Sequence, residues 1–161
     1  MNRLKIFKGK KIIITGHTGF KGSWLTVWLK SLGSNILGIS LKPQTKPSNY
    51  YDCKISKDVK TIFLDIQSKK KLKKIVLNFK PDFIFHLAAQ SIVLKSFSEP
   101  TNTWQTNLIG TMNILESLRN LNKKCAVILV TSDKCYKNVE QKKGYKENDV
   151  LGGEDPYSAS K

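Results

Sequence analysis

The 161-residue chain lacks a long hydrophobic run, because its apolar stretches, such as residues 125–130, are only as long as a strand. A membrane-spanning helix needs about 20 apolar residues, so none is expected. The first eleven residues, MNRLKIFKGKK, contain too short an apolar stretch for a secretion signal. These absences predict a cytoplasmic protein without a membrane partner.

Cysteine is scarce as well. Cys53, Cys125 and Cys135 are scattered and form no C-x-x-C pair, which excludes a disulfide framework and gives no reason to expect a zinc or other metal site. Cys125 precedes an apolar run, and we expect it to be a buried small hydrophobe.

Arginine occurs only at Arg3 and Arg119, although the net charge is +16. The positive charge is therefore almost all lysine, and it is spread along the chain. Specific nucleic-acid recognition depends on arginine forks, so we expect no nucleic-acid partner. The charge instead favours a polyanionic cofactor or a nucleotide-diphosphate substrate.

What the chain does contain is a glycine-rich turn in residues 11–24, KIIITGHTGFKGSW. An isoleucine-rich strand runs into Gly16, Gly19 and Gly22, and a helical pattern follows. This order is typical of a loop that binds a dinucleotide pyrophosphate at a helix N-terminus. An ATP-binding loop would need Gly-Lys-Ser, whereas residues 21–23 read Lys-Gly-Ser. A turn whose glycines serve packing alone is the other alternative.

The apolar pattern alternates between strands and helices. We expect strands at 10–15, 34–39, 59–64, 82–87 and 126–130, and helices at 19–32, 68–79 and 103–121, with another beginning at Pro156. The helix at 103–121 carries Leu108, Met112, Leu115 and Leu118 on one face. This alternation predicts an α/β fold with a doubly wound parallel, Rossmann-like sheet, and it shows neither an internal repeat nor a second domain.

Ligands of such sheets bind beyond the carboxyl ends of the strands. The glycine turn, Asp65, Ala88-Ala89 and residues 131–134 all follow expected strands. Near the end of the chain, Tyr157 and Lys161 are four residues apart and would share one helix face. An ammonium near a phenol favours the phenolate, which can accept a proton from an alcohol while a nicotinamide accepts a hydride.

Four stretches carry a family resemblance: TGHTGFKGSWL at 15–25, HLAAQ at 86–90, TSDKCY at 131–136 and DPYSASK at 155–161. They resemble the extended short-chain dehydrogenase/reductases, which form the NAD-dependent epimerase/dehydratase superfamily. Within this superfamily they look most like the CDP-glucose 4,6-dehydratases. The resemblance covers residues 10–161 but only the amino-terminal half of a family member. It implies that residues 1–161 are an incomplete dinucleotide-binding domain, truncated before the last strands, and that the carboxyl-terminal substrate domain is absent.

The resemblance implies NAD as the cofactor, CDP-glucose as the nucleotide-sugar substrate, and a homo-oligomer at full length. The glycine turn would bind the pyrophosphate, with Thr18, Phe20 and Lys21 alongside it. Asp65 and Ile66 would lie near the adenine. The remaining cofactor contacts would come from Ala88, Ala89, Gln90 and Asn107, the last supported by Thr106.

The resemblance also implies the catalytic residues. Tyr157 and Lys161 would oxidise C4 of the sugar, with Ser132 hydrogen-bonded to the same hydroxyl. Water would then leave across C5 and C6, Asp133 would protonate the departing hydroxyl, and the hydride would return to C6. The product would be CDP-4-keto-6-deoxyglucose, a precursor of surface polysaccharide.

Two positions depart from the patterns. Lys134 stands where related dTDP-glucose dehydratases have the glutamate expected as C5 base, so it either acts as a neutral amine or forms a salt bridge. Ser40-Leu41-Lys42 stands where an acidic residue would hold the ribose hydroxyls. The residues alone therefore leave NAD and NADP open.

Three alternatives remain on the sequence: a dehydratase for another nucleotide sugar, a 4-epimerase, and a non-catalytic NAD-binding fragment.

Overall fold

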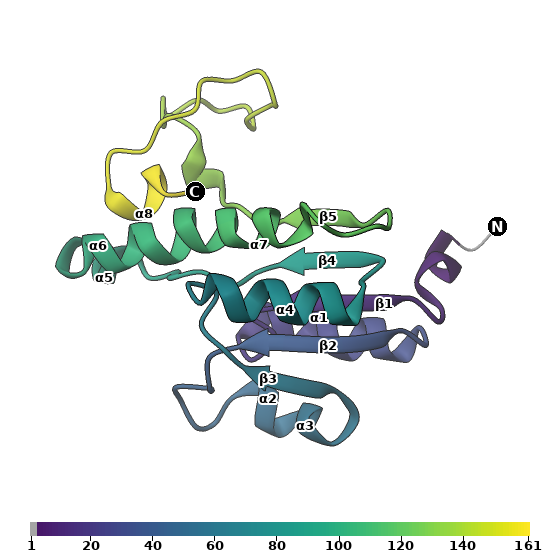
Figure 1. Cartoon of the computed structure of the whole chain (residues 1–161). Helices are drawn as coiled ribbons and strands as arrows, with labels where there is room; N and C mark the ends of the chain where they lie inside the picture. Colours follow the sequence, from purple (N-terminus) through teal and green to yellow (C-terminus); the bar gives the residue numbers. More distant parts are fainter. Residues whose placement is uncertain (1–2) are drawn as a thin grey trace.

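The computed structural model describes residues 3–161 and contains a five-stranded parallel sheet (Figure 1). Its strands are β1 (Lys11–Thr15), β2 (Asn35–Ser40), β3 (Lys60–Phe63), β4 (Phe83–His86) and β5 (Ala126–Leu129), in the spatial order β3-β2-β1-β4-β5. β1 is central and pairs in parallel with β2 and β4. The order reverses next to β1, which places the crevice for a ligand at the end of that strand.

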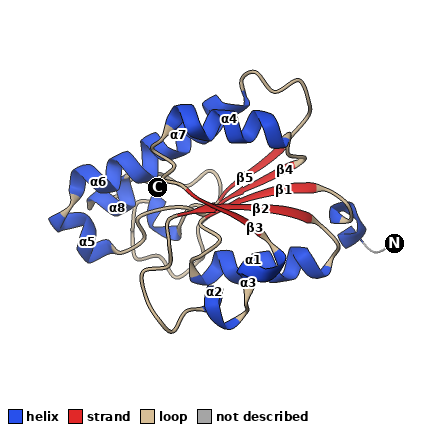
Figure 2. Cartoon of the chain, turned by 60° about the horizontal axis from the view of Figure 1, so that its bottom comes forward, coloured by secondary structure: helices blue, strands red, loops and turns tan. Residues whose placement is uncertain are grey.

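Two layers of helices cover the sheet (Figure 2). One layer contains α1 (Phe20–Ser31), α2 (Asn49–Asp52) and α3 (Ile55–Asp58). The other contains α4 (Lys69–Phe79) and α7 (Gly110–Leu118). The short helices α5 (Val93–Ser98), α6 (Pro100–Trp104) and α8 (Pro156–Ala159) lie toward the carboxyl ends of the strands. Three further turns are η1 (Arg3–Phe7), the π-helical η2 (Gln105–Ile109) and η3 (Asp133–Cys135).

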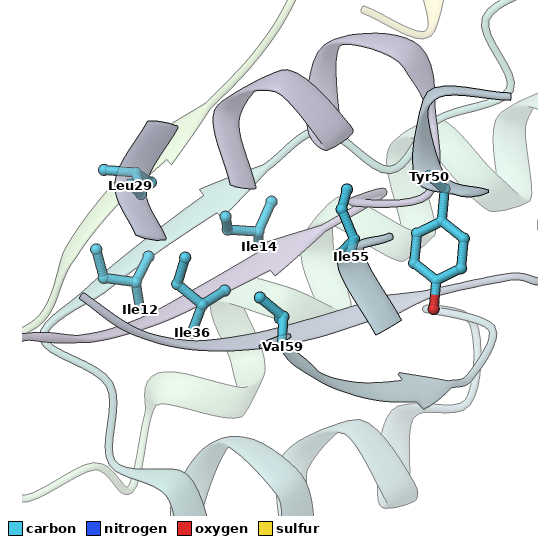
Figure 3. Packing of buried hydrophobic residues seen from close by; sticks show 7 residues of the cluster. All are labelled: Ile12, Ile14, Leu29, Ile36, Tyr50, Ile55 and Val59. Carbon is cyan, nitrogen blue, oxygen red and sulfur yellow. The ribbon is translucent and has the colours of Figure 1, made fainter. Parts of the chain in front are cut away.

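Successive residues of β1 point to opposite faces of the sheet and so enter different cores. Ile12 and Ile14 pack beneath α1, α2 and α3, whereas Ile13 packs beneath α4 and α7. Figure 3 shows the first core, whose buried members are Ile12, Ile14, Leu29, Ile36, Tyr50, Ile55 and Val59. With both faces covered, the central strand is held without freedom to shift its register.

The predicted α/β class and the five strands are confirmed, with strand boundaries that differ by at most one residue. α2, α3, α5 and η1 were not expected, since each is shorter than two helical turns. The predicted helix at 103–121 is instead a run of α6, η2 and α7. Cys125 precedes β5 and is only partly buried.

Three of the four residues predicted to form an apolar face of that helix are exposed, whereas Leu118 is partly buried and packs against the second core. Leu108, Met112 and Leu115 are each nearly half exposed. The buried face carries Asn107, Gly110, Asn113, Ile114 and Ser117. Gly110 is needed there because a Cβ would lie 2.4 Å from the Cδ1 of Ile66. Small and polar residues therefore allow this helix to approach the sheet closely.

Between η3 and α8 the chain makes an excursion over residues 136–151. It is closed by an antiparallel bridge between Tyr136 and Leu151 and by the stacked rings of Tyr136 and Tyr145, 5.0 Å apart. Within residues 3–161, no helix is both long and apolar enough to cross a bilayer.

Candidate active site

The glycine turn at the end of β1 has no room for side chains at two positions. Gly16 has φ +72°, and a Cβ there would lie 2.7 Å from the backbone nitrogen of Ala88. A Cβ on Gly22 would lie 2.1 Å from the carbonyl oxygen of Gly16. The first glycine therefore lets β1 and β4 meet, and the third lets α1 pack onto the turn.

The N-terminus of α1 is open to a ligand. Gly19 is its N-cap and offers no side-chain hydrogen bond, and the first turn contains no acidic residue. Gly19, Phe20 and Lys21 are exposed. Uncapped amide groups at the start of a 12-residue helix favour an anion, and the adjacent Lys21 adds positive charge.

A hydroxyl pair connects this turn to β2. Thr18 Oγ1 lies 2.7 Å from Ser40 Oγ and donates to the carbonyl oxygen of Leu41 at 3.0 Å. The segment that follows β2 is thereby fixed beside the glycine turn. Asp65, at the end of neighbouring β3, is partly buried and accepts the backbone N–H of Gln67 at 2.9 Å. Ile66 is buried against Gly110, so its side chain belongs to the core.

Asn107 connects three parts of the site. Its Oδ1 accepts the backbone N–H of Gln90 at 2.8 Å, and its Nδ2 donates to the Gln90 carbonyl at 3.1 Å. The same Nδ2 donates to Ser160 Oγ at 2.9 Å. Gln90 also donates from Nε2 to Thr103 Oγ1 at 3.0 Å. One buried amide thus fixes the loop after β4 against both η2 and the end of α8.

Below this loop, His86 lies in a chain of hydroxyl groups. Its Nδ1 is 2.7 Å from Thr15 Oγ1, and its Nε2 is 2.9 Å from Thr111 Oγ1. Thr111 donates to the Asn107 carbonyl at 2.6 Å, so it accepts a proton from Nε2. Thr15 accepts the backbone N–H groups of Leu87 and Ala88 and has its own proton free for Nδ1. The contacts assign His86 as the neutral Nε2–H tautomer.

Burial, together with the nearby charge of Lys161, lowers the pKa of His86 to about 4. His17, in the glycine turn, is also fully buried and its Nε2 is 2.9 Å from Thr61 Oγ1. Burial lowers its pKa to about 4. Both histidines are therefore neutral structural groups near pH 7.

Tyr157 lies in α8, and Lys161 follows that helix, which packs against α5 and α6 toward the carboxyl ends of the strands (Figure 1). Tyr157 is buried, and the Lys161 ammonium is 5.9 Å from the centre of its ring. Burial and the charge of Lys21 lower the pKa of Lys161. Neither the Tyr157 hydroxyl nor the Lys161 ammonium has a hydrogen-bond partner within residues 3–161. A cavity of about 140 Å³ opens here, lined by His86, Ala88, Asn107, Thr111, Ser160 and Lys161 among others.

Ser132, Asp133 and Lys134 follow β5, on the other side of α8. Ser132 Oγ donates to Asp133 Oδ1 at 3.0 Å and accepts the backbone N–H of Lys134 at 3.3 Å. Asp133 and Lys134 line a second cavity of about 450 Å³ with Asp155 and Ser158 from the α8 segment. The alternative salt bridge of Lys134 is not formed in the described part of the chain, although its charge contributes to lowering the pKa of Asp155.

The structure brings the predicted glycine turn, Ala88, Ala89, Gln90 and Asn107 to one edge of the sheet, together with Ser132, Asp133, Lys134, Tyr157 and Lys161. The side chain of Ile66 is buried in the core, and its place near the adenine stays a prediction. The sequence reasoning missed Thr15, Thr111 and Ser160. The signal for them was weak, since single hydroxyl residues in apolar elements are common. The described residues hold no group of three His, Cys, Asp or Glu side chains that could bind a metal.

The residues present fit a dinucleotide. At the glycine turn, β1 and the end of β4 approach each other closely, and α1 begins without a side-chain cap. Lys21 is adjacent, and the exposed Gly19 leaves its backbone accessible to a pyrophosphate. A parallel sheet whose strand order reverses at such a turn defines the Rossmann class of nucleotide-binding folds.

Within that class the comparison with known proteins is specific. The family model described as GDP-mannose 4,6 dehydratase matches residues 13–161, and the chain belongs to this family. It is 42% identical over 155 residues to CDP-glucose 4,6-dehydratase of Salmonella typhimurium strain LT2 and 31% identical over 160 residues to a GDP-mannose 4,6-dehydratase of Vibrio cholerae. The aligned regions cover 96% and 94% of this chain but 43% of each relative. The chain thus spans less than half the length of these relatives.

Solved structures share the fold. The epimerase Mth375 of Methanothermobacter thermautotrophicus superposes with a TM-score of 0.83 at 23% identity, over 99% of this chain and 46% of that one. The UDP-glucose 4-epimerase of Thermus thermophilus, solved as a complex with NAD, gives 0.80 at 26% identity, over 93% of this chain and 47% of that one. The predicted nucleotide-sugar dehydratase and epimerase relationship is confirmed.

Proposed function

We propose that this chain is the NAD-binding part of a lyase that dehydrates CDP-glucose to CDP-4-keto-6-deoxyglucose. The observation that carries the proposal is the convergence at one sheet edge of an open glycine turn with Tyr157 and Lys161. The charge of Lys21 acts on Lys161, so the turn and the terminal helix share one electrostatic environment. The 42% identity to the Salmonella enzyme supports the choice of CDP-glucose.

In the proposed complex, the pyrophosphate of NAD binds at Gly16, Thr18, Gly19, Phe20, Lys21 and Gly22. Ser40 faces the ribose of the adenosine half, and Asp65 lies near its base. The backbone of Ala88, Ala89 and Gln90, held by Asn107, supports the nicotinamide half. Bound NAD would accept a hydride from C4 of the sugar and return it to C6.

Side chains of this chain would carry out the proton transfers of the reaction. Tyr157, as the phenolate, accepts the proton of the C4 hydroxyl, and the Lys161 ammonium stabilises this phenolate before the proton arrives. Ser132 hydrogen-bonds the same sugar hydroxyl. The 4-keto group acidifies the C5 proton, which Lys134 would remove as a neutral amine while Asp133 protonates the hydroxyl that leaves C6 as water. When the hydride returns to C6, the Lys134 ammonium would return the proton to C5.

The test uses the complete protein, because the chain spans under half of its relatives. We expect incubation with CDP-glucose to give a product lighter by one water, with a C6 methyl group detected by proton NMR. Tyr157→Phe should lower kcat by about a hundredfold to ten-thousandfold. Faster turnover of dTDP-glucose, UDP-glucose or GDP-mannose would overturn the substrate assignment. A product of unchanged mass and inverted C4 would make the protein an epimerase.

A non-catalytic role is the second candidate for the chain taken alone, because the compared relatives extend well beyond it. Titration calorimetry of the 161-residue chain should show NAD binding. Measurable binding of CDP-glucose to the same sample would contradict the candidate.

A further inference from the structure

The outer face of α1 carries large apolar side chains. This helix turns small residues and one leucine toward the sheet, namely Gly22, Ser23, Thr26 and Leu29. On the opposite side, Trp24 and Trp28 are 56% and 45% exposed, and Val27 is exposed as well. Because residues three and four positions apart share one helix face, these three side chains form a single apolar stripe. Exposed apolar surface of this kind marks an interaction site.

The turn η1 extends the stripe. The ring of Phe7 packs edge-on against Trp28, with ring centres 6.4 Å apart. Gly9 donates its backbone N–H to the Gly33 carbonyl at 2.8 Å, so η1 is fixed beside the end of α1 (Figure 2). Ile6, the neighbour of Phe7, is 56% exposed. We call the exposed residues of both elements the α1–η1 surface; its apolar members are Ile6, Trp24, Val27 and Trp28.

The charge of this surface is positive. Residues 4–33 contain six exposed lysines but no arginine, aspartate or glutamate. Lys11 contacts the Phe79 ring of α4 and Lys21 belongs to the glycine turn. The lysines that remain are Lys5, Lys8, Lys10 and Lys30, and none of them forms a salt bridge within residues 3–161. The neighbouring segment 49–58, which forms α2 and α3, has two acidic residues and two lysines and is neutral. The surface therefore favours an anionic partner.

The types of side chain favour a lipid surface over a protein partner. Protein interfaces are enriched in arginine and depleted in lysine, whereas the cations here are all lysine. Tryptophan, with its apolar ring and single N–H, is enriched where the acyl chains of a bilayer meet water. Lysine is attracted to anionic headgroups, and a helix that combines an apolar stripe with lysines binds in the plane of the interface.

We propose that the α1–η1 surface binds peripherally to a bilayer that contains anionic phospholipids. Trp24 and Trp28 insert at the level of the headgroups, and the lysines face the lipid phosphates. The lack of a long apolar run predicted no membrane partner, but that argument concerns spanning helices and not contact with a membrane surface. The inference does not depend on the proposed function, since neither tryptophan is a proposed contact of the cofactor.

The test is co-sedimentation of the 161-residue chain with vesicles, together with its tryptophan fluorescence. One set of vesicles contains phosphatidylcholine and phosphatidylglycerol in equal parts, and the other contains phosphatidylcholine alone. We expect binding to the first set, with the emission shifted to shorter wavelength, and much weaker binding to the second. Binding should also weaken in about 1 M NaCl, where the Debye length is about 3 Å.

Two variants test the two features separately. Lys5→Glu with Lys30→Glu should lower the partition coefficient for the anionic vesicles by about tenfold or more, because two attractive charges become repulsive. Trp24→Ala should lower it by about threefold to tenfold and reduce the shift in emission, because less apolar area is inserted. Urea unfolding of each variant verifies that the fold is retained.

The matched controls lie on other parts of the molecule. Lys70→Glu with Lys74→Glu makes the same charge change at exposed positions of α4, in the opposite helix layer. Trp104→Ala removes the remaining tryptophan, which lies in α6 and is also exposed. Neither control should change the partition coefficient by more than about twofold.

No binding to the anionic vesicles would overturn the inference. An equal loss of binding in the two lysine pairs would overturn it too, because net charge and not this surface would then be responsible. If the chain did not bind vesicles but self-associated, and Trp24→Ala prevented the self-association, the surface would be a protein interface and the inference would be wrong.

Discussion

The imidazole of His86 has both nitrogens occupied by threonine hydroxyls, Thr15 from β1 and Thr111 from α7. A second proton on the ring would have no acceptor at Nδ1, because Thr15 would have to turn its own proton elsewhere. Protonation would therefore disrupt contacts to the central strand and to the helix above it. His17 has a similarly enclosed position between Thr61 and Tyr50.

The first prediction concerns the two histidines, which are the only ones in the sequence. Because both pKa values are lowered to about 4, the folded chain binds fewer protons than the unfolded chain between about pH 4 and 6.5. The free energy of unfolding should be constant above about pH 6.5 and fall as pH decreases toward 4. The loss should be at most about 3 kcal/mol per histidine.

Urea unfolding at pH 7 and pH 5 measures the loss, and NMR titration of the imidazole carbons measures the pKa values. A histidine-containing peptide gives the reference pKa. Imidazole pKa values near 6.5 in the folded chain would contradict the prediction.

The second prediction concerns the third glycine of the turn. Gly22→Ala places a methyl group within contact distance of a backbone carbonyl, which has no flexible side chain that could move aside. We expect a loss of about 2–4 kcal/mol in unfolding free energy and a weaker binding of dinucleotides. Gly144→Ala is the control, since a Cβ at that position meets no atom within 4 Å. Equal stabilities of the two variants would contradict the close packing of α1 on the turn.

At the scale of elements, Asn107 in η2 fixes two segments that are otherwise distant in the sequence. Asn107→Ala would leave the Gln90 backbone N–H and carbonyl and the Ser160 hydroxyl without this partner. The third prediction is a destabilisation of about 3 kcal/mol. Faster amide hydrogen exchange should be confined to residues 88–92 and 155–161.

Asn102→Ala is the matched control, because its amide contacts only the exposed carboxylate of Glu99. It should change stability by less than about 0.5 kcal/mol. If amide hydrogen exchange in the Asn107 variant were faster over the whole sheet, Asn107 would stabilise the entire core and not only the two segments that it joins.

The elements that the sequence predicted well are those with long, regular patterns. The isoleucines of β1 and the spacing of Leu72 and Val76 in α4 each identify their element from local residues. α2, α3 and α5 have four to six residues and form through contacts with the rest of the fold. The π-helical η2 was not predicted, because the apolar spacing of this segment also fits a regular α-helix.

At the scale of the whole molecule, α7 and β5 leave an apolar surface open. Its exposed members are Leu108, Met112 and Leu115 of the η2–α7 helix, and Leu129 of β5, which is on the same face of the strand as Val127. Contiguous apolar surface of this kind favours association. The fourth prediction is that the 161-residue chain self-associates with rising concentration, and that Met112→Glu with Leu115→Glu reduces the association.

Sedimentation velocity over a concentration series measures this effect. Because both side chains are nearly half exposed, the double variant should unfold at a similar urea concentration to the parent chain. Trp24→Glu with Trp28→Glu, on the exposed side of α1, is a control of equal charge. A chain that stays monomeric at all concentrations would contradict the prediction.

The sequence predicted those parts of the candidate site that come directly after a strand. The positions of the glycine turn and Gln90 follow from the rule that parallel strands end at one edge. Tyr157 follows no strand, and its pairing with Lys161 was predicted from their spacing on a helix. The contacts among them did not follow, because hydrogen bonds such as Asn107 to Ser160 join residues 53 positions apart. The contact of the Ile66 side chain with Gly110 could not be predicted either, because it joins two residues that are distant in the sequence.

The excursion over residues 136–151 is closed by its own bridge and by the stacked rings of Tyr136 and Tyr145. Residues 141–144 at its tip are exposed, and their amides take no part in the sheet. A short peptide tag inserted between Gln141 and Lys142 would therefore lengthen the tip without separating either pair of contacts. This makes the excursion a place for an affinity epitope or a fluorophore that reports on the neighbouring second cavity while the strands and the glycine turn keep their native sequence.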